Sequence, residues 1–282
     1  MFEEQKAELI KFILKNMFSK EQTNSLLDYL EIKVPSSIRN LNKNQFIDSL
    51  EKINQEITLG GINKYARSKW RKPPIDKHIK NLESGVLKEH GWYGTMPSTL
   101  HLSLQAMIRD YANSEKSSKT INDLIKTGSD IMKHEYFIVA VADICENIFI
   151  EKFEDAIPSI ASRGVIDFIF GDIPYDLKNS VIPNGWTFER ANNTPKTFIE
   201  FLVAGADVER MRKQAEGMHK NWGNNRLYVI AEYEDIWLDK PKKALEYLFH
   251  KATTIKNDSP FKIEISNGLT LLAKIIFIPK NL

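Results

Sequence analysis

Residues 163–180 read RGVIDFIF (163–170), GDIP (171–174) and YDLKNS (175–180), and they carry the strongest strand signal in the chain. The first run is apolar and rich in β-branched residues, the middle holds a glycine and a proline, and the last run alternates between apolar and polar residues. This pattern predicts two antiparallel strands joined by a tight turn. Charged residues stand inside both predicted strands, namely Asp167, Asp176 and Lys178.

The predicted hairpin brings these charges together. With a turn centred on Asp172 and Ile173, Asp167 lies opposite Lys178, two residues beyond Asp176. Strand side chains alternate between the two faces of a sheet, and cross-strand neighbours lie about 5 Å apart. The two acids and the lysine are therefore predicted to share one face, whereas Asp172 is interpreted as a turn residue, a position that favours Asp for backbone reasons.

Two carboxylates beside one ammonium on a half-buried sheet need compensation, because like charges repel and desolvated ions are costly. A divalent cation supplies it. Oxygen ligands without a nearby His or Cys suit Mg²⁺, with Mn²⁺ as a substitute. We therefore expect Asp167 and Asp176 to bind the metal, with Lys178 facing a water or a phosphate. The alternative is an ordinary solvated strand face with alternating charges.

The order Asp167, eight intervening residues and Asp176-x-Lys178 on consecutive strands resembles the active-site motif of the PD-(D/E)XK nuclease superfamily, which includes most type II restriction endonucleases. The resemblance covers roughly residues 146–233. It departs from the family pattern at Ile166, where the family name has Pro, and the second acid is Asp rather than the commoner Glu. It implies an α/β (α+β) fold with a restriction-endonuclease-like central mixed sheet flanked by helices.

The resemblance further implies a Mg²⁺-dependent endonuclease that hydrolyses phosphodiester bonds of double-stranded DNA, in the manner of a sequence-specific type II restriction enzyme and commonly as a homodimer. In such an enzyme a helical acid before the first catalytic strand can join the metal site. Three acids are candidates, of which the first is preferred: Glu146, Glu151 and Glu154. Two alternatives stay open, a repair or recombination nuclease of the same superfamily and a non-catalytic DNA-binding protein.

Two polar segments are candidates for DNA contact. Residues 64–80 carry seven basic residues against a single acid, with aromatic residues between them. Such a run is either a solvated face or a phosphate clamp, for which we nominate Lys69, Arg71 and Lys72. The second segment, residues 183–193, is predicted to be a loop directly after the second strand. Its side chains of the types that read base edges are Arg190, Asn192 and Asn193.

The 282 residues suffice for one large domain or two smaller ones, and the net charge of +2 leaves DNA affinity to local clusters. We predict a mainly helical region over residues 1–118, for DNA recognition or dimerisation, and a catalytic α/β region over residues 119–282. No signal peptide or membrane-spanning run is recognised, so a cytoplasmic protein is expected. The six histidines show no zinc-ligand spacing, and Cys145 is expected to be buried and inert.

Local patterns predict the remaining elements. An apolar stripe over residues 9–18 and another over residues 46–57 predict amphipathic helices, and Ser19-x-x-Gln22 is typical of a capping box. A buried strand is expected over residues 226–233, and residues 261–278 are expected to form a second hairpin.

Overall fold

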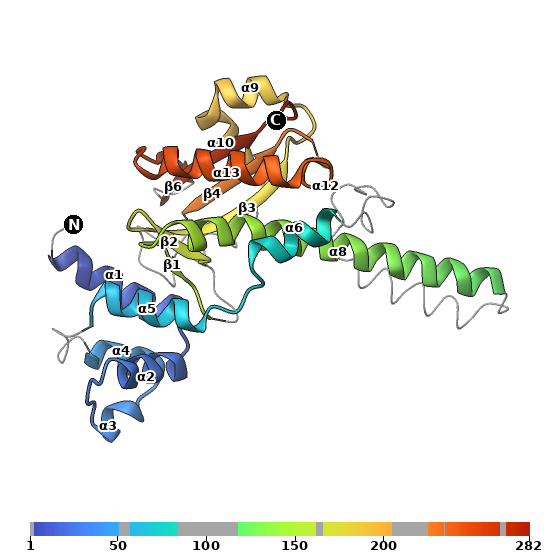
Figure 1. Cartoon of the computed structure of the whole chain (residues 1–282). Helices are drawn as coiled ribbons and strands as arrows, with labels where there is room; N and C mark the ends of the chain where they lie inside the picture. Colours follow the sequence, from blue (N-terminus) through green and yellow to red (C-terminus); the bar gives the residue numbers. More distant parts are fainter. Residues whose placement is uncertain are drawn as a thin grey trace.

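The computed structural model describes residues 3–50, 57–83, 118–161, 166–204, 225–233, 235–265 and 269–282. Their centre is a six-stranded mixed sheet of order β1-β2-β3-β4-β6-β5, flanked by helices (Figure 1). The strands are β1 (Ile157–Pro158), β2 (Phe168–Phe170), β3 (Ile173–Val181), β4 (Arg226–Ala231), β5 (Phe261–Ile265) and β6 (Leu269–Ile278). The expectation of a mixed sheet flanked by helices is confirmed.

The sheet combines two kinds of pairing. Strands β1, β2 and β3 pair antiparallel, β3 and β4 pair parallel, β4 and β6 pair parallel, and β5 and β6 form the expected antiparallel hairpin. The short strand β1 was not predicted from the sequence. All six residues of β4 are buried, as expected for a parallel strand that is covered on both faces.

The hairpin of β2 and β3 forms as predicted, but its turn is shorter than expected. Phe168 pairs with Tyr175, where the predicted register would place Phe170, and Phe170 instead pairs with Ile173. The two turn residues, Gly171 and Asp172, both have positive φ, 57° and 62°. Two consecutive positive φ angles belong to the two-residue turn that best fits twisted strands. The predicted register is therefore wrong by two residues, a shift that leaves each side chain on its expected face.

The N-terminal region is helical, as predicted. Its helices are α1 (Glu3–Asn16), α2 (Lys20–Tyr29), α3 (Ser36–Arg39), α4 (Lys43–Leu50) and α5 (Leu59–Lys69). The capping box before α2 is present, because Ser19 and Gln22 exchange side-chain and backbone hydrogen bonds. The apolar faces of these helices form one core cluster that also includes Ile157, Ile166 and Ile169 from the β1–β2 edge of the sheet.

The basic stretch 64–80 covers the end of α5, a connector over residues 70–74, and the start of α6 (Ile75–Glu83). Helix α6 packs on α8 (Ser118–Lys152), and both contribute to the core on one face of the sheet. Arg67 fixes α5 to the end of α8, because its guanidinium donates to the backbone oxygens of Ile150 and Ala156 at 2.6 and 2.9 Å. Ile150 lies in the last turn of α8, where carbonyls have no partner within the helix, so Arg67 caps this end, and Ala156 lies just beyond it.

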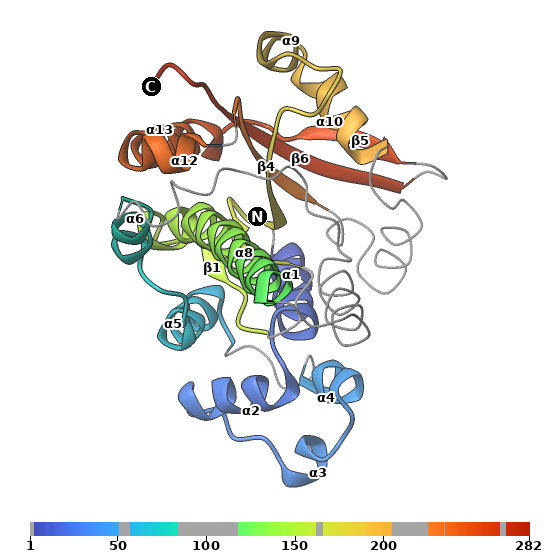
Figure 2. The same cartoon turned by 90° about the vertical axis from the view of Figure 1, so that its right-hand side faces the viewer.

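Helices cover both faces of the sheet (Figure 2). Helices α12 (Ile236–Asp239) and α13 (Pro241–Lys256) join α6 and α8 on the first face, and α9 (Phe188–Asn193) and α10 (Pro195–Ala204) cover the second. Cys145 is buried in the first core, as expected. Among the residues that the structure describes, no helix has the length and apolar character needed to cross a membrane.

Two predictions about the organisation of the chain concern the loop over residues 183–193 and the boundary at residue 118. The predicted loop over residues 183–193 is wrong in its second half, which forms α9 because Thr187 accepts a hydrogen bond from the Arg190 amide and caps the helix. The predicted boundary at residue 118 coincides with the first residue of α8, and residues 84–117 lie outside the described part of the chain. Residues 75–83 share a core with α8.

Candidate active site

Asp167 lies directly before β2 and is fixed by the backbones of two neighbouring strands. Its amide donates to the Tyr175 oxygen at 2.9 Å, and its carbonyl accepts from the Ser159 amide at 2.8 Å. Its side chain is also held, because Oδ2 accepts a hydrogen bond from the Leu177 amide at 2.7 Å. The carboxylate is thus anchored to β3, on the strand that carries the other two predicted site residues.

Asp176 and Lys178 lie on β3, two residues apart, so their side chains share one face of the strand. Lys178 Nζ lies 2.7 Å from Asp176 Oδ1, which confirms that these two groups meet. The second oxygen, Oδ2, lies 3.1 Å from an Nη atom of Arg226 at the start of β4. The Asp176 side chain is mostly buried, whereas that of Lys178 is 47% exposed. Lys178 is therefore the most solvent-accessible of the three side chains in this pair of contacts.

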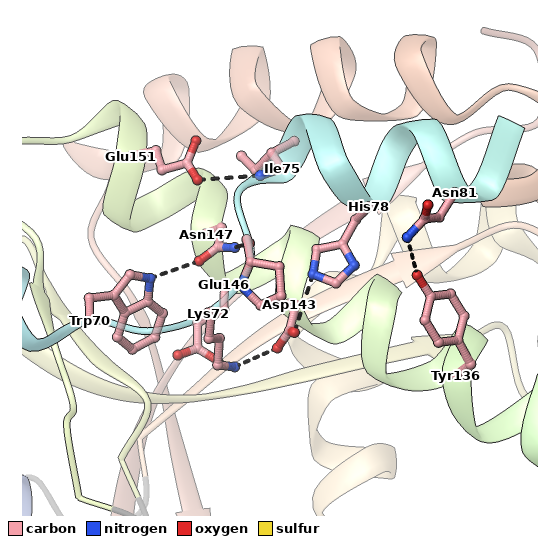
Figure 3. Close-up of polar contacts among 11 residues, drawn as sticks. Trp70, Lys72, Ile75, His78, Asn81, Tyr136, Asp143, Glu146, Asn147 and Glu151 are labelled. Carbon is pink, nitrogen blue, oxygen red and sulfur yellow. Dashed lines mark hydrogen bonds and ion pairs between the residues drawn. The ribbon is translucent and has the colours of Figure 1, made fainter.

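A second acidic group lies on α8, opposite the connector 70–74 (Figure 3). Lys72 Nζ bonds to Glu146 Oε2 and also lies 2.9 Å from Asp143 Oδ1. On the far side of Asp143, His78 Nε2 lies 3.3 Å from Oδ2. Glu146, Asp143 and His78 are all buried, so α6, the connector and α8 share a buried polar network.

The two groups are electrostatically coupled. Burial raises the pKa of Glu146 to about 7, with the charge of Asp167 adding to the rise and that of Lys72 opposing it. Burial also raises the pKa of Asp167, the charge of Asp176 adds to this, and its hydrogen bond from Leu177 opposes it. Four carboxylates, those of Asp143, Glu146, Asp167 and Asp176, thus lie among three basic side chains, those of Lys72, Lys178 and Arg226. The site holds more negative than positive charge whenever its acids are ionised.

This donor set is suited to a hard divalent cation. It offers carboxylate oxygens, which Mg²⁺ prefers, and the pKa values of Glu146 and Asp167 are raised by burial first and by neighbouring carboxylates second, so a bound cation would favour the ionised forms. Asp167 and Asp176 are the residues that would hold the ion. Within the described ranges, no group of three or more His, Cys, Asp or Glu side chains is arranged to hold a metal ion. A two-carboxylate site completed by water and phosphate oxygens agrees with both observations.

The three helical acids named from the sequence differ in their positions. Glu146 is buried and electrostatically coupled to Asp167. Glu151 is exposed, and its Oε1 lies 3.4 Å from the Ile75 amide. Glu154 is also exposed, and its backbone oxygen accepts from Asn63 at 2.6 Å. Glu146 is therefore the acid of the three that lies near the predicted metal ligands.

The nominated DNA-binding residues fall into two groups. Lys69 and Arg71 are exposed on the end of α5 and on the connector, whereas Lys72 is engaged by two acids. On α9, Arg190 stacks over the Trp186 ring at 4.2 Å. The two other residues of the second group are exposed on that helix, Asn192 and Asn193.

Three residues of the site were missed by reasoning from the sequence, namely Asp143, His78 and Arg226. Arg226 had a detectable signal, because it opens a strand that is otherwise apolar, just as Asp167 interrupts an apolar run. Asp143 stands three residues before Glu146 and therefore on the same face of α8. His78 has no such signal, since a single histidine on an apolar helix face is common.

Because comparisons with known proteins found no match, the function of the chain has to be argued from the site itself. A scan against protein-family models found no match, and neither a search of curated proteins nor a search of solved structures found a similar protein.

Proposed function

We propose that the protein is a Mg²⁺-dependent endonuclease that hydrolyses phosphodiester bonds of double-stranded DNA, with a restriction-endonuclease-like core. The proposal is supported by the pairing of Lys178 with Asp176 on β3 and by Asp167, whose carboxylate accepts from the Leu177 amide and interacts electrostatically with both side chains. The order of helix, antiparallel strands, helices and parallel strand from α8 to β4 agrees with the superfamily that the motif resembles. Mn²⁺ is expected to substitute for Mg²⁺.

Each residue has a role that follows from its surroundings. Asp167 and Asp176 would hold the cation, since each is fixed by hydrogen bonds or ion pairs before the metal binds. A bound Mg²⁺ supplies Lewis acidity at the phosphoryl oxygen. The half-exposed ammonium of Lys178 would orient the attacking water and balance the negative charge that develops on the phosphate.

The test is cleavage of plasmid DNA by the wild-type protein in Mg²⁺ or Mn²⁺, beside Asp167→Asn, Asp176→Asn and Lys178→Met. Each substitution is expected to lower the rate by roughly 100-fold or more, because each removes a group at the reacting phosphate. Asp172→Asn is the matched control, since Asp172 is an exposed acid in the adjacent turn and Asn tolerates its positive φ. Equal rates for all five proteins would refute the assignment.

The products decide between the possible roles. Discrete fragments of one plasmid indicate a sequence-specific restriction enzyme, which is the role we propose. Nicking, ladders or junction-specific cutting would instead indicate a repair or recombination nuclease with the same chemistry. Retention of DNA without any cutting in either metal would indicate a non-catalytic DNA-binding protein.

We also propose that the active form is a homodimer, because cutting two antiparallel strands in one event takes two sites. Light scattering on the free protein and on its complex with duplex DNA gives the mass directly. A monomer in both states would contradict this part of the proposal.

A further inference from the structure

Strand β5 forms one edge of the sheet, and none of the described residues pairs with its outer side. The opposite edge differs, because β1 has two residues and packs against α5. Strand β5 has five residues, and Ile263 at its centre is buried in the core beneath α10. An edge strand of this kind offers a row of backbone groups to another chain.

The backbone groups that point outward from β5 belong to Lys262 and Glu264. Leu272, which pairs with Lys262, donates its amide to Asn225 Oδ1 at 2.9 Å, on the β4 side of β6. Lys262 and Leu272 are therefore a pair without mutual hydrogen bonds, and such pairs alternate with hydrogen-bonded ones along an antiparallel ladder. The next pair of this kind is Glu264 with Thr270. Lys262 and Glu264 thus turn their N–H and C=O groups away from β6.

The side chains of the same two residues complement a second copy of the strand. Both are exposed, on the face opposite Ile263, and neither takes part in an ion pair within the described part of the chain. When β5 meets a copy of itself about a two-fold axis at Ile263, Lys262 of each copy lies opposite Glu264 of the other. Opposite charges in this position stabilise a strand pair, whereas like charges destabilise it.

Charged side chains on an edge strand commonly prevent pairing with other chains. Strand β5 departs from that pattern, because its two charges have opposite signs and stand at the two positions that the axis exchanges. The same two residues carry the outward backbone groups, so each facing pair exchanges both of its N–H···O bonds. Backbone geometry and charge therefore select the same register.

We propose that β5 is the surface through which two copies of this chain associate, as an antiparallel pair of edge strands centred on Ile263. The two sheets then continue into each other, and α10 of both copies lies on the same face, because a two-fold axis perpendicular to the sheet preserves its faces. This inference supplies the interface of the homodimer in the proposed function and rests on that part of it.

The pairing also places both candidate active sites on one side of the joined sheet. Aligned residues of neighbouring strands point to the same face, and Asp176 aligns with Arg226, which aligns with Ala273. Ala273 lies in the core beneath α10, together with Ile263. The axis preserves this face, so one duplex lying across it faces both sites.

The experiment is sedimentation equilibrium of the full-length protein, alone and with duplex DNA in the presence of a chelator. Lys262→Glu and Glu264→Lys each turn both opposite-charge pairs into like-charge pairs, so each is expected to raise the dimer dissociation constant by about tenfold or more. The double variant with both exchanges is expected to return to within about threefold of the wild type, since opposite charges face each other again. Single variants that associate as tightly as the wild type, or a double variant that stays weak, overturn the inference.

Two further variants separate strand pairing from a general effect of charge. Glu246→Lys makes the same change as Glu264→Lys on the exposed side of α13, and its association should stay within about twofold of the wild type. Lys262→Pro removes an outward amide and leaves the ladder to β6 intact, so it should weaken the dimer while thermal unfolding still shows a folded protein. A dimer that Lys262→Pro leaves unchanged contradicts the pairing.

The mass of the wild type separates this inference from the proposed function. If the wild type is a monomer both alone and on DNA, this inference and the proposed homodimer fail together, and the cleavage assay still tests the nuclease. If the wild type and both single charge variants dimerise equally, only the β5 interface fails. If the single variants dissociate and no metal-dependent cleavage occurs, the interface stands and the nuclease assignment fails.

Discussion

The guanidinium of Arg226 lies 3.1 Å from Asp176 Oδ2, across the parallel pair that β3 and β4 form. The other oxygen of the same carboxylate lies 2.7 Å from Lys178 Nζ. One carboxylate is thus shared between a buried cation on the adjacent strand and a half-exposed cation on its own strand. The two cations have the same charge but different surroundings, so their removal should have different consequences.

Arg226→Met is expected to destabilise the metal-free protein by about 3 kcal/mol, because it leaves a largely buried carboxylate without its buried partner. Lys178→Met is expected to cost less than about 1 kcal/mol, because the Lys178 side chain is half exposed and its ion pair is screened by water. Urea denaturation with a metal chelator measures both. Similar losses for the two variants would show that Arg226 does not have the larger role.

The stability of the metal-free protein should depend on pH in a defined direction. The pKa of Glu146 rises on folding from its ordinary 4.5 to about 7, because of burial first and the charge of Asp167 second. The folded state therefore binds this proton more tightly than the unfolded state. The contribution of this proton binding to the free energy of unfolding is fully present below about pH 4.5 and is lost as the pH rises to about 7.

Denaturation curves at several pH values within this window give the slope of the free energy of unfolding. Glu146→Gln should flatten the slope, because its side chain does not titrate. Added Mg²⁺ should restore stability at the upper end of the window, where the acids are ionised. A slope that is the same in Glu146→Gln would mean that another group is responsible.

The turn between β2 and β3 gives a test of the register. Gly171→Ala is expected to cost about 1 kcal/mol, because an L-residue is strained at a φ of 57°. Steric crowding does not cause this loss of stability, since an added Cβ would meet only the Lys256 oxygen at 3.5 Å, an ordinary contact. Asp172→Gly should be neutral or slightly stabilising, because glycine adopts the φ of 62° without strain. Thermal unfolding of both variants checks the prediction.

The basic stretch should contribute unequally to DNA affinity. Lys69→Met and Arg71→Met are each expected to lower the dependence of affinity on salt concentration by about one counterion, because both side chains are exposed. Lys72→Met should change this dependence little, since two carboxylates already engage its ammonium. Fluorescence anisotropy of a labelled duplex, with a chelator to prevent cleavage, measures the slopes. A change in Lys72→Met as large as in Lys69→Met would contradict this assignment.

Local patterns in the sequence predicted most of the regular elements, because strand alternation, helical stripes and the capping box act over a few residues. They also placed Asp176 beside Lys178, since residues two apart on a strand share a face. The register of the hairpin was missed because it depends on whether Gly171 and Asp172 both adopt positive φ, and the sequence alone also permits a longer turn.

The rest of the site depends on contacts between distant segments. Arg226 meets Asp176 only because β3 and β4 pair in parallel, and Lys72 meets Glu146 across 74 positions of the chain. No local pattern encodes either contact. Lys69, Arg71 and Lys72 were nominated for DNA contact because their charge was visible in the sequence, whereas the pairing of Lys72 with Glu146 and Asp143 was not.

The contacts of Arg67 and Lys72 with α8 bear on where the protein can be shortened. A fragment that begins at residue 119 would keep Asp167, Asp176 and Lys178, yet it would lose the guanidinium that caps Ile150 and Ala156 and the ammonium beside Glu146. Excision of the helical segment would thus leave backbone carbonyls at and just beyond the end of α8 without their donor and leave buried acids without their cation. The smallest autonomously folding unit that keeps the candidate site therefore has to include residues 67–72.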